Sequence, residues 1–200
     1  LNCASFNGST IESELFGHSK GAFTGANTDK AGIFEAANGG WVFLDEVGCL
    51  SLETQAKMLR LLENSEVKRL GENRIRKVKV RILSATNENI EVLAENGVFR
   101  EDFRQRLIGK TIEVSPLRER QEEIPEIILK ICKSLENGPY TISAAAVNLL
   151  GSLPWKKGNI RELKNCLREM TAHHVDHHLS TELIPPRFLE ESHDAKVIAP

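Results

Sequence analysis

Residues 39–46 read Gly-Gly-Trp-Val-Phe-Leu-Asp-Glu, and this stretch decides the fold class. The four apolar residues are too few for a helix, and the two glycines before them interrupt any helical period. A short apolar run of this kind is typical of a strand that is buried on both faces of a parallel sheet. Asp45 and Glu46 would then stand at the carboxyl end of the strand, where open α/β sheets bind their ligands.

Two further segments have the pattern of strands. Residues 77–85 alternate polar and apolar before becoming apolar, and residues 111–114 form a third candidate. Helices are expected over 9–17, which opens with a Ser/Thr cap signal, and over 51–63, where apolar residues recur at helical spacing. Strands separated by helices predict an α/β fold with a parallel sheet.

Beyond Pro116 the sequence shows only helical patterns, with Gly and Pro residues between them. These patterns cover four ranges, roughly 122–136, 143–152, 159–174 and 181–191. We therefore expect an α/β core over residues 1–115 and a small helical subdomain over 116–200. Leu1-Asn2-Cys3 reads as the end of a strand, which predicts that the sequence is a piece of a longer protein.

The composition argues against several classes of protein. Hydrophobic residues make up 40% and charged residues 27% of the chain, an ordinary balance for a soluble globular protein. No stretch is apolar over the length that a bilayer requires, and none reads as a signal peptide. The net charge of -2 argues against a broad nucleic-acid-binding face. The four cysteines form no C-x-x-C pair, so we expect reduced thiols and a cytoplasmic location.

The acidic strand end has the chemistry of nucleotide hydrolysis. An aspartate there can hold the hydration shell of magnesium, and a glutamate can orient or deprotonate the attacking water. A chance pair of acids is the alternative. Asn87 ends the segment Ser-Ala-Thr-Asn after the second strand, where it could bond the same water or a terminal phosphate. Otherwise it opens a loop or caps a helix.

Two arginine-containing segments are candidates for phosphate contacts. Residues 99–106 hold three arginines within seven residues, which suits neutralisation of transition-state charge, although a solvated helix face is the usual explanation. In Gly-Asn-Ile-Arg, residues 158–161, Asn159 would cap a helix and place Arg161 in its first turn. Arg161 could then reach a phosphate, or it could simply be exposed.

The long loop expected over residues 18–32 contains an aromatic side chain between glycines. That side chain has no core to enter, and an exposed apolar tip often marks a contact with a partner; a packed turn is the alternative. The segment expected to contact the partner consists of Gly21, Ala22, Phe23, Thr24, Gly25 and Ala26.

Six motifs, in the same order, resemble one family. ESELFGH followed by GAFTGA resembles the signature of sigma-54-dependent transcriptional activators, which are AAA+ ATPases. GGWVFLDEVGCL is similar to their Walker B segment, SATN to sensor I, FREDFRQRL to the arginine-finger segment, SPLRER to the start of the lid, and GNIRELKN to sensor II. Together the motifs span nearly the whole chain, so the plainer alternatives give way to the family interpretation.

The resemblance implies a partial AAA+ parallel-sheet core followed by a helical lid, with ATP and Mg²⁺ as cofactors. Asp45 would hold magnesium through a bound water, and Glu46 would polarise the attacking water. Asn2 matches the position that restrains this glutamate and couples it to the nucleotide state. Asn87 would sense the terminal phosphate, and Arg161 would reach that phosphate from the lid.

The family resemblance also implies partners. Arg100 and Arg106 would act in trans on the nucleotide of a neighbouring subunit, which requires a ring, usually a hexamer. Phe23 and Thr24 would touch sigma-54 and drive remodelling of RNA polymerase at closed promoters. In the complete protein, of which response regulators are one type, promoter or enhancer DNA is bound by a domain after the lid. No membrane contact is implied.

The sequence departs from the family pattern at several positions. Trp41 stands in place of Thr, Cys49 in place of Glu, and Lys156-Lys157 in place of a single Pro. The phosphate-binding Gly-x-x-x-x-Gly-Lys-Ser/Thr is absent, since the Gly-Lys-Thr of residues 109–111 has Arg104 at the first glycine position. We therefore expect these 200 residues alone to bind ATP weakly and not to hydrolyse it. The alternative function is a non-catalytic module that contacts the sigma factor.

A histidine-rich segment follows the last long helical pattern. It could place two histidine pairs at i, i+4 on a helix and bind a transition metal, but the family uses no metal there, so we expect a solvated helix end. The segment contains His173, His174, Asp176, His177 and His178.

Overall fold

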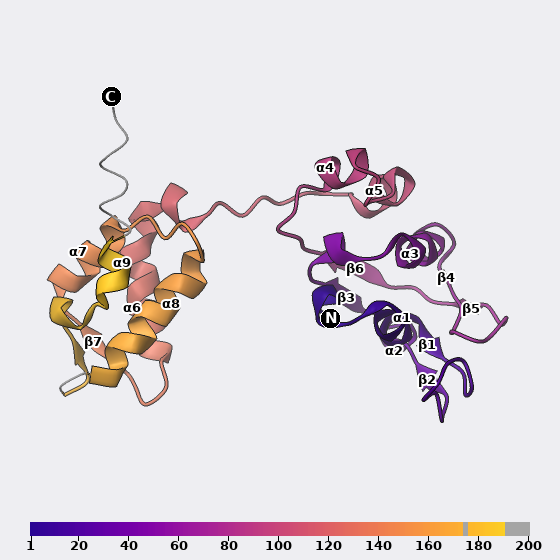
Figure 1. Cartoon of the computed structure of the whole chain (residues 1–200), viewed down its shortest axis with the longest axis horizontal. Helices are drawn as coiled ribbons and strands as arrows, with labels where there is room; N and C mark the ends of the chain where they lie inside the picture. Colours follow the sequence, from indigo (N-terminus) through magenta and orange to yellow (C-terminus); the bar gives the residue numbers. More distant parts are fainter. Residues whose placement is uncertain (174–175, 191–200) are drawn as a thin grey trace. The chain divides into compact units, whose positions relative to one another are not determined.

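The computed structural model describes residues 1–173 and 176–190. The chain divides into two compact units, Leu1–Thr111 and a second unit that begins at Ile112 (Figure 1). In the first unit the helices are α1 (Gly8–Phe16), α2 (Ile33–Ala36), α3 (Leu52–Asn64), α4 (Ile90–Glu95) and α5 (Glu101–Leu107). Its strands are β1 (Gly17–His18), β2 (Lys30–Ala31), β3 (Trp41–Leu44), β4 (Glu66–Val67), β5 (Arg76–Lys77) and β6 (Arg81–Ser84). Short 3-10 turns are η1 (Cys3–Ser5) and η2 (Val47–Cys49).

The parallel pair β3–β6 is the centre of the first unit (Figure 1). The register runs from Trp41 opposite Arg81 to Leu44 opposite Ser84. On the other side of β3, a parallel bridge joins Asn2 to Asp45. The α/β fold with a parallel sheet, expected from the apolar run before Asp45, is confirmed.

Only one face of β3 is buried. Val42 and Leu44 are 2% and 0% exposed and belong to a core that also contains residues of α1, α2, α3 and α5. Trp41 and Phe43, on the opposite face, are 65% and 49% exposed, so the expectation of burial on both faces was wrong. The guanidinium of Arg81 lies 5.2 Å from the centre of the Trp41 ring. The helices of the first unit pack on the face of Val42 and Leu44, and Trp41 and Phe43 on the other face stay exposed.

Residues 111–114 do not form the expected third strand. Ile112 and Val114 are 75% and 76% exposed, and no strand of the described residues pairs with this segment. A strand needs a neighbour for its N–H and C=O groups. The apolar alternation alone therefore does not produce a strand here.

Two short hairpins extend from the first unit. In one, β1 pairs antiparallel with β2, so the long loop expected over residues 18–32 has a paired base. In the other, β4 pairs antiparallel with β5, with Glu66 opposite Lys77. A parallel bridge between His18 and Leu70 joins the two hairpins.

The second unit is mostly helical, as expected. Its elements are η3 (Leu117–Glu119), η4 (Gln121–Glu123), α6 (Ile124–Ser134), β7 (Thr141–Ile142), α7 (Ala144–Ser152), α8 (Asn159–Met170), η5 (Thr171–His173), β8 (His178–Leu179), η6 (Thr181–Leu183) and α9 (Pro186–Glu190). The apolar faces of α6, α7 and α8 form one core with Leu117 and Trp155. The indole of Trp155 donates to the carbonyl of Leu150 at 2.9 Å and so satisfies its buried N–H.

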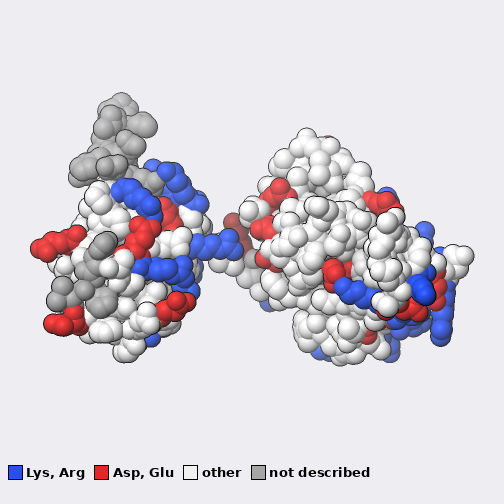
Figure 2. Space-filling model, turned by 60° about the horizontal axis from the view of Figure 1, so that its bottom comes forward, with Lys and Arg blue, Asp and Glu red and all other residues white. Residues whose placement is uncertain are grey.

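In Figure 2 charged side chains of both signs are visible on each unit, and on the first unit they gather toward one side and leave a broad uncharged area. Within these groups basic and acidic side chains of the described residues are intermixed, in line with the net charge of -2. Among the described residues, we find no helix with the length and apolarity needed to cross a membrane.

A buried carboxylate ties α1 to α3. Glu12 of α1 is 8% exposed, and it accepts hydrogen bonds from the Thr54 hydroxyl at 3.2 Å and from the Lys57 ammonium at 2.8 Å. Lys57 also bonds the exposed Glu53 at 2.9 Å. Burial lowers the pKa of Lys57, but its bonds to the two carboxylates outweigh that effect and raise the pKa. The buried charge of Glu12 is thus balanced within the core.

We predict that Lys57→Met lowers the free energy of unfolding by about 2 kcal/mol, because it leaves the Glu12 carboxylate buried without its cation. Glu53→Gln removes the exposed partner of the same lysine and should have a much smaller effect, because solvent screens that pair. Urea denaturation of the two variants measures the difference. Equal effects of both substitutions would contradict the importance of the buried pair.

Candidate functional site

The strand register brings the acidic residues next to the end of β6. Leu44 lies opposite Ser84, and the amide of Ala85 donates to the Leu44 carbonyl at 2.8 Å. One step further, the amide of Val47 donates to the Ala85 carbonyl at 3.1 Å. Asp45 and Glu46 therefore lie at the same sheet edge as Asn87.

Glu46 has a backbone conformation that is uncommon for a residue with a side chain. Its φ and ψ are 57° and 49°, in the left-handed region. This turn sends the chain from β3 into η2 and brings a Glu46 carboxylate oxygen to 3.5 Å from the backbone N–H of Asn87. Strained residues held by surrounding structure are a frequent feature of functional sites, so the conformation supports a role for Glu46.

Asn2 contacts Asp45 and not, as expected, Glu46. Its side-chain N–H donates to the Asp45 carboxylate at 3.0 Å, while its side-chain oxygen accepts from the amide of Ala4 at 2.9 Å. The bridge between Asn2 and Asp45 sets the two residues directly opposite, so the short amide reaches the nearer carboxylate. Asn2 thus fixes the orientation of Asp45.

The turn after Glu46 packs tightly against the segment after β6. A Cβ at Gly48 would come within 2.2 Å of a carboxylate oxygen of the exposed Glu88 and 3.2 Å of the Thr86 hydroxyl, so a larger residue there would displace the Glu88 side chain. Cys49 is the exposed one of the four cysteines. Partial burial raises the pKa of its thiol, and the nearby Glu88 and Glu46 carboxylates raise it further.

The loop of residues 21–26 is compact and presents its middle residues to solvent. The amide of Gly21 donates to the Ala26 carbonyl at 2.8 Å, and Ala26 is buried. Phe23 is 38% exposed, and its ring lies edge-on to the buried His18 at 5.0 Å. Thr24, which follows Phe23, is also exposed. The loop therefore combines an anchored base with an accessible aromatic tip.

The β4–β5 hairpin supports this loop, a contact that no sequence motif indicated. The amide of Ser19 donates to the Leu70 carbonyl at 3.0 Å, and the amide of Leu70 donates to the Gly17 carbonyl at 2.9 Å. A side chain at Gly71, whose φ is +73°, would come within 2.7 Å of Ala22. Glycine is therefore required where the two loops meet.

A charged network holds the hairpin to α2. Arg69 donates two hydrogen bonds to Glu35, at 2.7 and 2.8 Å, and Arg76 lies 3.4 Å from the same carboxylate. Arg76 also bonds Glu72 at 2.8 Å, which lowers the pKa of that carboxyl. These side chains are largely covered, and a paired Arg–carboxylate contact is geometrically specific.

Of the three arginines in residues 99–106, Arg100 and Arg106 differ from Arg104. Arg104 is held within α5 by two bonds of 2.8 Å to Glu101, which lower the pKa of that carboxyl to about 2. Arg100 stands at the start of α5 with its exposed guanidinium on Asp102. Arg106 is the most exposed, at 63%, and lies 3.4 Å from Glu63.

In the second unit, Asn159 does not cap α8 with its side chain. Its φ is +50°, and its side-chain oxygen accepts from the backbone N–H of Leu117 at 2.9 Å. The carboxylate of Glu162 instead accepts from the amide of Gly158 at 3.0 Å and closes the helix start. The expected cap was wrong because the amide is engaged with η3. Arg161 still lies in the first turn and is exposed.

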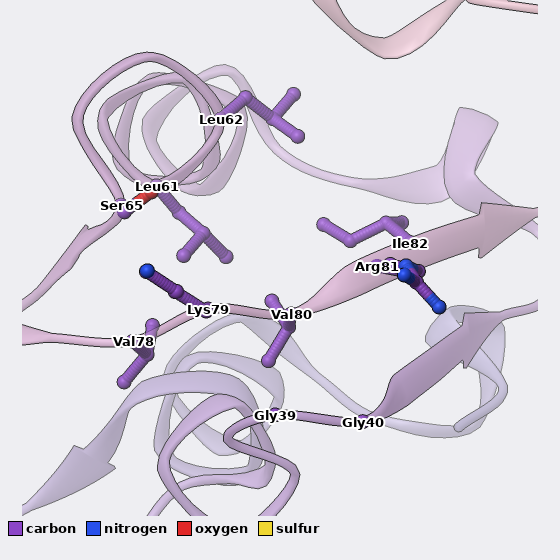
Figure 3. Close-up of a pocket in the computed structure, with 10 residues that line it drawn as sticks. All are labelled: Gly39, Gly40, Leu61, Leu62, Ser65, Val78, Lys79, Val80, Arg81 and Ile82. Atoms are coloured by element: carbon purple, nitrogen blue, oxygen red, sulfur yellow. The ribbon is translucent and has the colours of Figure 1, made fainter.

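Two other candidate sites are the histidine-rich segment of the second unit and a cavity in the first unit. The histidine-rich segment lies partly outside the described residues, and within the described part no group of three or more metal-binding side chains occurs. A cavity of about 560 Å³ lies at the amino ends of β3 and β6, between Gly39 and Gly40 and the last turn of α3 (Figure 3). Its lining contains no carboxylate, so it is separate from the acidic edge.

Comparison with known families gives two matches, one after the other along the chain. Residues 1–113 match the model of the sigma-54 interaction domain, and residues 118–199 match the AAA+ ATPase lid domain. The chain belongs to the sigma-54 interaction domain family. The family assignment from the six sequence motifs is thereby confirmed.

Relatives of this sigma-54 interaction domain are transcriptional regulators. The Nif-specific regulatory protein of Azotobacter vinelandii is 48% identical over 84% of this chain and 32% of the relative. The sigma-54-dependent transcriptional activator SfnR of Pseudomonas putida is 46% identical over 84% of this chain and 46% of the relative. The chain thus spans about a third to a half of the length of these relatives.

Solved structures show the same fold. NtrX from Brucella abortus in complex with ATP has a TM-score of 0.81 at 31% identity, over 95% of this chain and 42% of that one. The ADP complex of the same protein also has a TM-score of 0.81, over 100% of this chain and 47% of that one. RuvB from Thermotoga maritima, at 18% identity and a TM-score of 0.56, shares the fold alone.

One carboxylate of this sigma-54 interaction domain fits a water-mediated contact with magnesium. Magnesium is usually held by one or two carboxylates together with waters and substrate phosphates, rather than by a cage of protein ligands. Asp45 supplies a half-buried carboxylate at the acidic edge, with one oxygen bonded by Asn2 and the other without a recorded bond among the described residues. A single oriented carboxylate is what such a water-mediated contact requires.

Proposed function

We propose that this chain is the core and lid of an ATPase domain that couples ATP hydrolysis to remodelling of sigma-54 RNA polymerase. The observation that carries the proposal is the meeting of Asp45, Glu46 and Asn87 at one sheet edge. In the same unit, the carboxyl end of α1 leads to the exposed GAFTGA loop. The core would comprise residues 1–115 and the lid 116–200. Promoter or enhancer DNA would be bound by another part of the complete protein.

In this proposal the acidic edge prepares the attacking water. Asp45, oriented by Asn2, would hold Mg²⁺ through its water shell, and the metal would supply positive charge to the phosphates. Glu46 accepts a hydrogen bond from the water and aligns it with the terminal phosphate. The side-chain amide of Asn87 donates to the same phosphate, while its backbone N–H lies 3.5 Å from a Glu46 carboxylate oxygen. Arg161 adds positive charge from the lid.

Arg100 and Arg106 would complete the site of a neighbouring subunit. Both are exposed at α5, whereas the catalytic acids lie at the ends of the strands. An arginine that stabilises transition-state charge contributes about 10³–10⁵ in rate, so a lone subunit would turn over slowly. The domain would therefore act as a ring, usually a hexamer.

The GAFTGA loop would make the contact with sigma-54. Phe23 and Thr24 are exposed, and the loop is fixed at its base by Ala26 and by the β4–β5 hairpin. α1 leads into this loop, and its Glu12 is bonded to α3, which follows the acidic turn. A packed connection thus exists from the candidate hydrolysis site to the loop.

We predict that the complete protein loses most ATPase activity with Arg106→Ala or with Glu46→Ala, and that mixing the two restores part of it. Each mixed ring contains boundaries where an intact Glu46 faces an intact Arg106. Phosphate release at varied mixing ratios measures the recovery, and native mass spectrometry verifies that mixed rings form. Mixed rings without any recovered turnover would contradict the action in trans.

We also predict that Thr24→Ala in the complete protein abolishes open-complex formation but leaves substantial ATPase activity. Thr24 is exposed on a loop away from the acidic edge, so its loss affects the partner contact alone. Thr28→Ala, at an exposed position of the same hairpin outside the six-residue motif, is the control and should retain both activities. Equal loss of both activities in a folded Thr24→Ala protein would refute the assignment.

A further inference from the structure

Gln55 is a polar side chain with no exposure to solvent. It lies in the first turns of α3, beside Thr54, and every hydrogen bond of its amide goes to the backbone of another segment. Its N–H groups donate to the carbonyls of Leu50 at 2.7 Å and Val98 at 3.0 Å. Its oxygen accepts from the backbone N–H of Arg100 at 2.8 Å.

These bonds bracket the start of the arginine segment. Val98 and Arg100 stand on either side of Phe99, which is 1% exposed and packs against Phe103 with the ring centres 5.2 Å apart. Phe99 holds the segment by apolar packing, which does not by itself fix the direction of the backbone. Gln55 supplies that direction, because both a donor and an acceptor of the segment must meet one rigid amide.

The third bond links this segment to the acidic turn. Leu50 follows η2, which begins directly after Glu46, and its carbonyl accepts from the same amide nitrogen that bonds Val98. Gln55 therefore joins the turn after the catalytic acids to the residue at which α5 begins. Among the described residues, the Arg100 amide donates its hydrogen bond to the Gln55 side chain.

We propose that Gln55 is a positioning residue that aims Arg100 at the nucleotide of the neighbouring subunit, an inference that rests on the proposed ring ATPase. Gln55 does not touch nucleotide in this proposal. It acts by fixing the Arg100 backbone; the guanidinium itself is bonded to the exposed Asp102, and 40% of the Arg100 side chain is exposed. A displacement of about 1 Å of a catalytic group costs about 100-fold in rate. Fixing the backbone at Arg100 therefore preserves much of the rate acceleration that this arginine provides.

The test uses Gln55→Met in the complete protein, which keeps the side-chain length but removes all three hydrogen bonds. We expect turnover to fall about 100-fold with little change in KM for ATP, because the subunit's own phosphate contacts remain. Asn64→Leu is the matched control, since Asn64 is an exposed amide side chain at the end of the same helix α3. The control should retain its turnover.

Mixing experiments identify how Gln55 acts. Gln55→Met should recover turnover when mixed with Glu46→Ala, which supplies an intact arginine segment. It should recover none with Arg100→Ala, because neither subunit then presents a correctly positioned Arg100. Recovery with Arg100→Ala, or unchanged turnover of Gln55→Met alone, would overturn the inference.

Two further measurements separate the possible failures. If Arg100→Ala and Glu46→Ala do not complement each other in mixed rings, the proposed action in trans is wrong, whatever Gln55 does. If Gln55→Met does not fold, Gln55→Glu takes its place, since the carboxylate still accepts from the Arg100 amide but cannot donate to Val98 and Leu50. It should show the same mixing pattern, and complementation of Arg100→Ala would again overturn the inference.

Discussion

The parallel pairing of β3 with β6 is the constraint on which the rest of this structure depends. Parallel strands end at the same sheet edge, so the register that sets Leu44 opposite Ser84 also sets the two acids beside the Ser-Ala-Thr-Asn segment. A shift of one residue would turn Leu44 toward solvent and Phe43 into the core. Burial of Val42 and Leu44 therefore fixes the register, and the register fixes the chemistry of the edge.

Helix α3 connects the parts of the molecule that the proposed cycle requires. On one side its Thr54 and Lys57 hold the buried Glu12 of α1, which leads to the GAFTGA loop. On the other side its Gln55 holds the arginine segment. Buried polar groups of this kind are costly unless all are satisfied, so each of these contacts has a defined geometry. A change at the acidic turn can reach both surfaces through one rigid helix.

The sequence offers the candidate residues of the site more readily than the contacts between them. The acidic strand end, Asn87 and the exposed aromatic of the loop follow from local patterns, because strand ends and glycine-flanked turns are local features. The exposure of Trp41 and Phe43 could not be predicted, since an apolar run shows that a strand is apolar but not what covers it. Gln55 was missed because its partners are more than forty residues away for two of its three bonds.

The most direct test of the account is to locate the metal–nucleotide complex relative to the acidic edge. A nitroxide on Cys49, which is exposed three residues after Glu46, reports on that edge by electron paramagnetic resonance when Mn²⁺–ATP is added to the complete protein. A label at Lys79→Cys in a Cys49→Ser background reports on the amino end of β6. The account predicts a strong loss of signal amplitude for the label at Cys49, reversed by excess Mg²⁺–ATP, and little change for the label at position 79. Equal loss at both positions, or loss at position 79 alone, would contradict it.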